Sequence, residues 1–175
     1  QIPMYREIGM HDICAIKIVR KLIKKYKPNI IYAHSSKAGA IARIAAIGLK
    51  IHCVYNPHGW AFNMRCSVKK QNMYSVIEKI AALFCEKIIC ISDAEKESAL
   101  DKKICKEDKL QVIYNGIDIE EYEREEQKKT VRRTELNIPE DAFVVGMVGR
   151  ISAQKAPDIF IKMAMLIKNQ ISTAY

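Results

Sequence analysis

The chain has 175 residues, of which 49% are hydrophobic, and this is enough for one globular domain and part of a second. No apolar run approaches the roughly 20 residues that cross a bilayer. Residues 1–10 are too polar for a signal peptide, so we expect a cytoplasmic protein. The net charge of +9 comes from the first 70 residues, which hold 13 Lys/Arg against 2 Asp/Glu. This asymmetry suggests an anionic partner, whether a phosphate, a membrane surface or a nucleic acid.

Helices and strands are predicted to alternate through the first part of the chain. Asp12 is expected to cap a helix whose apolar residues recur at helical spacing until Lys27-Pro28. Ser92 is a second expected cap. The predicted strands are residues 29–33, 51–55, 87–91 and 110–114, and the predicted helices between them are residues 38–49, 67–84 and 93–100. This alternation is typical of an α/β fold, a Rossmann-like parallel sheet with helices on both faces.

The second part begins after a predicted turn at Asn115-Gly116. Residues 120–135 carry charges of both signs and predict a surface helix or linker. Residues 142–148 are apolar and predict a strand, and Pro157 opens a helix over residues 158–168. We therefore divide the chain into three parts: residues 1–117, a Rossmann-like domain incomplete at its N-terminus; residues 118–141, a hinge; and residues 142–175, the start of a second domain. One strand and one helix cannot bury a sheet face, so we expect a piece of a longer protein.

The six cysteines form no C-x-x-C pair, and several lie in apolar runs. Buried free thiols explain this pattern better than zinc ligands or disulfides. The six cysteines are Cys14, Cys53, Cys66, Cys85, Cys90 and Cys105.

Polar turns follow three of the predicted strands, and they are His34-Ser35-Ser36-Lys37, His58-Gly59 and Ser92-Asp93. The second strand ends at Asn56-Pro57, because proline lacks the N–H that a central strand needs, and His58-Gly59 follows at once. Ligands of open α/β sheets bind at the carboxyl ends of strands, so His58 is predicted to face a substrate, and Gly59 permits close approach of the backbone. The alternative is that His58 only caps a turn.

Five segments together resemble glycosyltransferase family 4, with its two Rossmann-like domains in the GT-B arrangement. They are IYAHSSKAGAIAR, YNPHGWAF, IEKIAALFCEKIICISDAEKESAL, VIYNGID and VVGMVGRISAQKAPD. The resemblance runs from about Arg6 to Leu166. It implies an enzyme that transfers a sugar, with retention of configuration, from a nucleotide-diphosphate sugar donor to a glycan or lipid-linked acceptor. The expected product is a surface polysaccharide or a glycolipid.

The resemblance also implies roles for single residues. His58 would bind hydroxyls of the donor sugar or the reacting oxygen, and Arg150 and Lys155 would stabilise the charge of the leaving diphosphate. These two cations flank a turn before a helix N-terminus, which also favours phosphate. Ser35, Ser36 and Lys37 are candidates for contact with acceptor or phosphate, or alternatively a solvent-facing helix cap.

Some features depart from the family pattern. Glu78 and Glu86 have the E-x7-E spacing of the donor-binding glutamates, but that motif belongs to the second domain, so we interpret the pair as surface charge. The true donor-binding glutamates are expected beyond Tyr175. Ala156 replaces the glycine that usually follows the lysine. There is no D-x-D motif, so we expect no metal and no cofactor other than the sugar-nucleotide co-substrate.

Two other classes of function compete with this interpretation. The basic first half fits peripheral contact with anionic lipid on the inner face of the membrane, but a non-catalytic module would bind nucleic acid through the same surface. The sequence has no nucleic-acid-binding motif and no aromatic stacking platform, so we expect no nucleic acid partner. A Rossmann-type isomerase or epimerase would need a G-x-G-x-x-G motif, which is absent. We expect the 175-residue chain alone to be nearly inactive.

Overall fold

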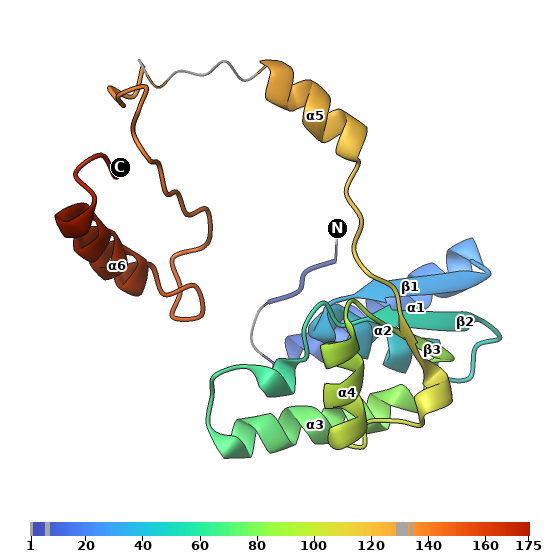
Figure 1. Cartoon of the computed structure of the whole chain (residues 1–175). Coiled ribbons are helices and arrows are strands. Elements are labelled where there is room, and N and C mark those ends of the chain that lie inside the picture. Colours follow the sequence, from blue (N-terminus) through green and yellow to red (C-terminus); the bar gives the residue numbers. More distant parts are fainter. Residues whose placement is uncertain (1, 6–7, 129–132, 134) are drawn as a thin grey trace. The chain divides into compact units, whose positions relative to one another are not determined.

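The structure is a computed structural model that describes residues 2–5, 8–128, 133 and 135–175 (Figure 1). It contains two compact units, Gln1–Asn115 and Gly116–Tyr175. Arg6, where the family resemblance begins, and part of the charged segment 120–135 lie outside the described residues.

A parallel sheet of four strands forms the centre of the first unit. The strands follow one another in the order β1-β2-β3-β4. β1 and β2 end together, because the register that pairs Ile30 with His52 also pairs His34 with Asn56. The strands are β1 (Ile30–His34), β2 (His52–Asn56), β3 (Lys87–Cys90) and β4 (Leu110–Val112). The predicted α/β alternation is confirmed.

The helices of this unit lie against one face of the sheet. α2 contacts β1 and β2, α4 contacts β3 and β4, and both α1 and α3 pack against α2. Each crossover steps to the next strand in the same direction, and right-handed crossovers of this kind place their helices on one side. The helices are α1 (His11–Tyr26), α2 (Ser36–Ala46), α3 (Val68–Ala82) and α4 (Asp93–Asp101), with 3-10 turns η1 (Ala61–Asn63) and η2 (Glu107–Lys109).

Burial alternates along the strands as this one-sided covering requires. Tyr55 and Ile88 are fully buried under the helices, in a core that also contains Trp60. On the other face, Val54 and Ile89 are only partly buried, and Tyr32 is 49% exposed. Helices were expected on both faces, but those of the described residues cover one. The remaining core residues include Cys53, Phe62, Ala82, Cys85, Cys90, Ala99, Ile104 and Leu110.

One helix cap is confirmed and another is wrong. Ser92 caps α4, and its hydroxyl accepts a hydrogen bond from the N–H of Glu95 at 3.2 Å. Asp12 lies inside α1, which begins at His11. Its carboxylate accepts a hydrogen bond from the N–H of Gly9 at 3.0 Å and pairs with Lys37, so Asp12 joins α1 to α2.

The interpretation of Glu78 as surface charge is wrong. Glu78 is 2% exposed, because it shares the buried face of α3 with Ser75 and Ala82. Its carboxylate lies 2.8 Å from Nη2 of Arg43 and accepts a hydrogen bond from the Tyr55 hydroxyl at 2.9 Å. The buried charge is tolerated because it is paired on both oxygens. Glu86 is exposed and pairs with His52 at 2.8 Å, as expected of a surface charge.

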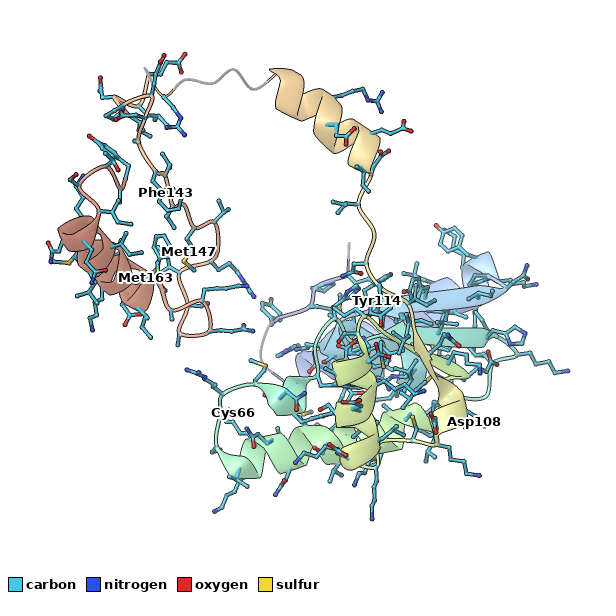
Figure 2. The ribbon with its side chains drawn as sticks, in the orientation of Figure 1. Cys66, Asp108, Tyr114, Phe143, Met147 and Met163 are labelled. Carbon is cyan, nitrogen blue, oxygen red and sulfur yellow. The ribbon has the colours of Figure 1, made fainter. Side chains whose placement is uncertain are left out.

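The second unit contains two helices, α5 (Ile119–Lys128) and α6 (Pro157–Gln170), and Pro157 lies in the first turn of α6 as predicted. The strand predicted over residues 142–148 is not formed. Phe143 makes only an isolated bridge with Ala174, because residues 173–175 are the one segment of the described unit that pairs with it. Figure 2 shows Phe143 and Met147 on this extended segment and Met163 on α6.

Candidate active site

Two histidines meet where β1 and β2 end. His34 is the last residue of β1, and His58 follows β2 by two residues. Nδ1 of His34 lies 2.8 Å from Nε2 of His58, and the two rings stack with an interplanar angle of 18°. One of these nitrogens donates the shared proton and the other accepts it, so the tautomer of each ring fixes that of the other.

The backbone holds His58 in an unusual conformation. His58 has φ +50°, in the left-handed region, and its N–H donates to Oδ1 of Asn56 at 3.0 Å. Nδ2 of Asn56 in turn lies 3.3 Å from the Tyr32 hydroxyl. Such a conformation costs about 1–2 kcal/mol for a residue with a side chain, and it persists only where its surroundings impose it.

Gly59 has φ +100°, a value that side chains rarely allow. Among the described residues other than 58–60, no atom would lie within 4 Å of a Cβ atom at this position. Glycine is therefore needed here for its backbone conformation, and the space above it is open. The close approach of a ligand at Gly59 stays a prediction.

Ser35, Ser36 and Lys37 continue from His34 into α2. The N–H of Ser35 donates to the carbonyl of Asn56 at 2.9 Å, which joins this turn to the His58 loop. Ser36 is the first residue of α2. The Nζ of Lys37 lies 2.8 Å from Asp12 and also bonds to the carbonyl of Tyr5, so its charge is paired within the unit.

Arg150 and Lys155 lie in the second unit, on the exposed turn that precedes α6. The aliphatic part of the Lys155 side chain passes over Gly149. The backbone N–H of Lys155 donates to the carbonyl of Ser152 at 3.0 Å. Within the described residues, the buried hydroxyl oxygen of Ser152 has no hydrogen-bond partner. Two cations and a hydroxyl thus share one turn.

Sequence reasoning missed two residues of the first unit. The sequence predicts His34 only as the first residue of a polar turn, although a histidine that ends the strand next to β2 must lie near one that follows β2. Glu95 was hidden, because the spacing Ser92-x-x-Glu95 resembles an ordinary capping box. In the structure Glu95 also accepts a hydrogen bond from the N–H of Gly59 at 2.5 Å.

All six cysteines are free thiols, as predicted. Cys53, Cys85 and Cys90 are buried, whereas Cys14 is exposed and Cys66 and Cys105 are partly buried. Burial raises the pKa of Cys53 to about 11 and that of Cys90 to about 12. No three His, Cys, Asp or Glu side chains among the described residues are grouped so as to hold a metal ion. In the same part of the chain, no helix is both long and apolar enough to cross a membrane.

The family model described as Glycosyltransferase Family 4 matches residues 2–121. The chain belongs to glycosyltransferase family 4. Among curated relatives of this family 4 chain, the Escherichia coli UDP-Gal:alpha-D-GlcNAc-diphosphoundecaprenol alpha-1,3-galactosyltransferase is 32% identical over 157 residues, which are 89% of the chain and 41% of that relative. The Staphylococcus aureus capsular polysaccharide biosynthesis glycosyltransferase CapM is 32% identical over 163 residues, which cover 88% and 41%. The chain thus spans about two fifths of the length of these relatives.

A solved structure has the same fold. The Anabaena protein Alr3699/HepE in complex with UDP and glucose matches with a TM-score of 0.67 and 25% identity, over 91% of this chain and 42% of that one. This likeness supports the Rossmann-like GT-B fold expected from the sequence.

Proposed function

We propose that the whole protein is a retaining hexosyltransferase that moves a sugar from a nucleotide-diphosphate donor to a lipid-linked or glycan acceptor in surface polysaccharide synthesis. The observation that carries this proposal is the His34–His58 pair at the carboxyl edge of the parallel sheet, held beside the open backbone of Gly59. The names of relatives add support, because one is named for a UDP-galactose donor and a diphosphoundecaprenol acceptor. HepE was solved with UDP and glucose bound.

The chemistry of the site follows from the histidine pair. Nε2 of His58 is engaged by His34, which leaves Nδ1 of His58 as the nitrogen that would bind a sugar hydroxyl or the reacting oxygen. In the transfer, the bond from the anomeric carbon to the diphosphate breaks while the oxygen of the acceptor hydroxyl bonds to that carbon, and the proton of this hydroxyl passes to the leaving diphosphate oxygen. A ring held in one orientation loses no orientational freedom as the transition state forms.

The leaving diphosphate would be stabilised in the second unit. It gains negative charge as the bond breaks, and fixed cations stabilise that charge more in the transition state than in the ground state. Arg150 and Lys155 are the cations proposed for this role, with the unpaired hydroxyl of Ser152 as an added donor. No metal is needed in this scheme. Ser35 and Ser36, next to His34, are proposed to meet the acceptor.

We also propose that the protein acts on the inner face of the membrane as a peripheral enzyme. The lysines at the end of α1 and just after it are exposed and positively charged, as a surface that binds anionic lipid requires. They are Lys21, Lys24, Lys25 and Lys27. Binding to vesicles that contain anionic lipid, measured by sedimentation, should fall when all four are changed to Gln. Equal binding of the variant would remove this part of the proposal.

Substitutions in the proposed diphosphate site distinguish the proposed transferase from a non-catalytic binding module. Arg150→Ala and Lys155→Ala should each lower the kcat of the whole protein for sugar transfer by about 10²-fold or more. Lys162→Ala is the matched control, because Lys162 is an exposed cation on α6. Transfer that survives both site substitutions would contradict the proposal. Unchanged binding of nucleic acid with no transfer in any form would favour the basic module.

A further inference from the structure

Glu95 is a buried carboxylate that the sugar-transfer chemistry above does not use. It lies in the first turn of α4 and is 6% exposed. Its two oxygens have separate partners: Oε1 accepts a hydrogen bond from the N–H of Gly59 at 2.5 Å, and Oε2 accepts one from the N–H of Ile91 at 2.7 Å. A buried charge is costly unless it is hydrogen-bonded, and this one is satisfied by two backbone groups from different loops.

These contacts differ from those of an ordinary capping box. In that motif the glutamate side chain returns to the N–H of the capping residue, here Ser92. The carboxylate of Glu95 instead reaches the preceding residue, Ile91, and the loop of Gly59, which lies 36 residues earlier in the chain. The carbonyl of Glu95 also accepts a hydrogen bond from Nε1 of Trp60 at 2.8 Å. One residue of α4 therefore holds two consecutive residues of the β2–α3 connection.

His58 lies between two anchors as a result. On one side, its own N–H is held by Oδ1 of Asn56. On the other side, the next residue, Gly59, is held by Glu95. Together these bonds hold the backbone of His58 at a φ that it would not adopt without them. In this conformation the His58 ring stacks against the ring of His34.

We propose that Glu95 is a positioning residue that holds the loop 58–60 so that His58 keeps its place against His34. The effect of Glu95 on catalysis rests on the proposed function, whereas its effect on the conformation of the loop 58–60 does not. A carboxylate suits the role because it offers two acceptors to two N–H donors. A glutamine offers one acceptor, and its amide group would face the second N–H without a bond.

The test is nuclear magnetic resonance of the 15N-labelled 175-residue chain, as wild type, Glu95→Gln and Glu97→Gln. Glu97 is the matched control, because it is an exposed glutamate on the same helix. In Glu95→Gln, we expect the Gly59 amide to exchange at least tenfold faster and the ring 15N signals of His58 to shift, while amides of β1 and β3 stay protected. Glu97→Gln should match wild type. Wild-type exchange at Gly59 together with wild-type His58 ring signals in Glu95→Gln would overturn the proposal.

Two further variants separate positioning from the stability of α4. Ser92→Ala removes the cap of α4 but leaves the carboxylate, so it should leave the His58 ring signals unchanged. If Ser92→Ala shifts them as much as Glu95→Gln does, Glu95 acts only through the helix and the proposal fails. Glu95→Asp keeps the charge on a side chain too short to reach both N–H groups. It should fold and show faster exchange at Gly59, which keeps the test decisive if Glu95→Gln does not fold.

Kinetics of the whole protein distinguish this proposal from the proposed function. Glu95→Gln should lower kcat for sugar transfer by about tenfold with little change in KM for the donor, since a misplaced group acts on the transition state. If His58→Ala leaves transfer intact, the catalytic role of His58 is refuted, while the resonance result on Glu95 stands or falls by itself.

Discussion

At the level of single residues, the proposed chemistry depends on two histidines that share one proton. His34→Phe keeps a ring of similar shape but removes the nitrogen that faces His58. The loss of one hydrogen bond worth about 1.4 kcal/mol corresponds to about a tenfold fall in kcat. We therefore expect that fall in the sugar-transfer rate of the whole protein, with KM for the donor nearly unchanged.

His52→Phe is the control for this experiment. His52 is exposed at the opposite end of β2, and its ring pairs with Glu86 at the surface. We expect its rate to equal that of wild type. Equal rates for His34→Phe and His52→Phe would show that the His34–His58 bond has no catalytic role.

The buried thiols predict a specific pattern of reactivity. The thiolate is the reactive form, and burial raises the pKa of Cys53 to about 11 and that of Cys90 to about 12, whereas Cys14 is exposed. At pH 8, iodoacetamide should label Cys14 of the folded chain and leave Cys53 and Cys90 unlabelled, as peptide mass spectrometry would show. Rapid labelling of Cys90 in folded protein would contradict its place in the core.

The raised pKa values of Cys53 and Cys90 also give the direction in which the stability of the chain changes with pH. A raised pKa means that folding favours the neutral thiol, so the contribution to stability is complete below the ordinary value of 9.0 and is lost as the pH rises towards 11 or 12. The urea midpoint of the chain should therefore fall between pH 9 and pH 11. A midpoint that rises over that interval would contradict the sign.

Only part of the site was predictable at this scale. A histidine followed by glycine after Asn-Pro marks a strand end, so His58 could be found from its neighbours alone. The left-handed φ of His58 and the bond from Glu95 to Gly59 depend on which loops the fold brings together, and no local pattern encodes a contact across 36 residues.

At the scale of elements, the packing of α2 and α3 depends on a buried ion pair. Arg43 is fully buried, and burial by itself would lower its pKa, but the charge of Glu78 outweighs this and raises it. Glu78→Ala would leave the guanidinium buried without its partner, which costs about 3–5 kcal/mol. Urea denaturation should show this loss, whereas Glu86→Ala should cost at most about 1 kcal/mol, because its pair with His52 is exposed. Similar losses for both variants would contradict the buried pair.

The residue before α6 gives a second prediction for an element. Ala156 has φ +48°, which explains why the family usually has glycine at this position. Ala156→Gly should stabilise α6 by about 1 kcal/mol, because glycine adopts this conformation without the steric cost that alanine incurs. Slower hydrogen exchange of the α6 amides would report the gain. Ala164→Gly, inside α6, should instead destabilise the helix by a similar amount.

The elements themselves were largely predictable, because hydrophobic periodicity and caps such as Ser92 are local signals. Two errors share one cause. Within the described part of the second unit, residues 142–148 have the composition of a strand but pair only with residues 173–175. Glu78 has the charge of a surface residue but faces Arg43. In both cases a distant partner, which a single sequence does not reveal, decides the outcome.

At the scale of the whole molecule, the two units divide the proposed work. The first unit belongs to the matched family region and holds the histidine pair, and the second holds Arg150 and Lys155. The chain spans about 41% of the length of its curated relatives. Calorimetric titration with nucleotide sugars should therefore show weak or no binding to the 175-residue chain and tight binding to the whole protein. Tight binding to the chain alone would show that its own residues complete the donor site.

The proposed role of His58 in sugar transfer can be tested by measuring the transfer itself. The whole protein, as wild type, His58→Ala and His52→Ala, is incubated with a radiolabelled UDP-hexose and a lipid-linked acceptor, and the labelled lipid product is counted. We expect product from wild type and His52→Ala, and at least a hundredfold less product from His58→Ala, although His58→Ala should still bind the donor. Equal product from all three proteins would contradict the proposed role of His58.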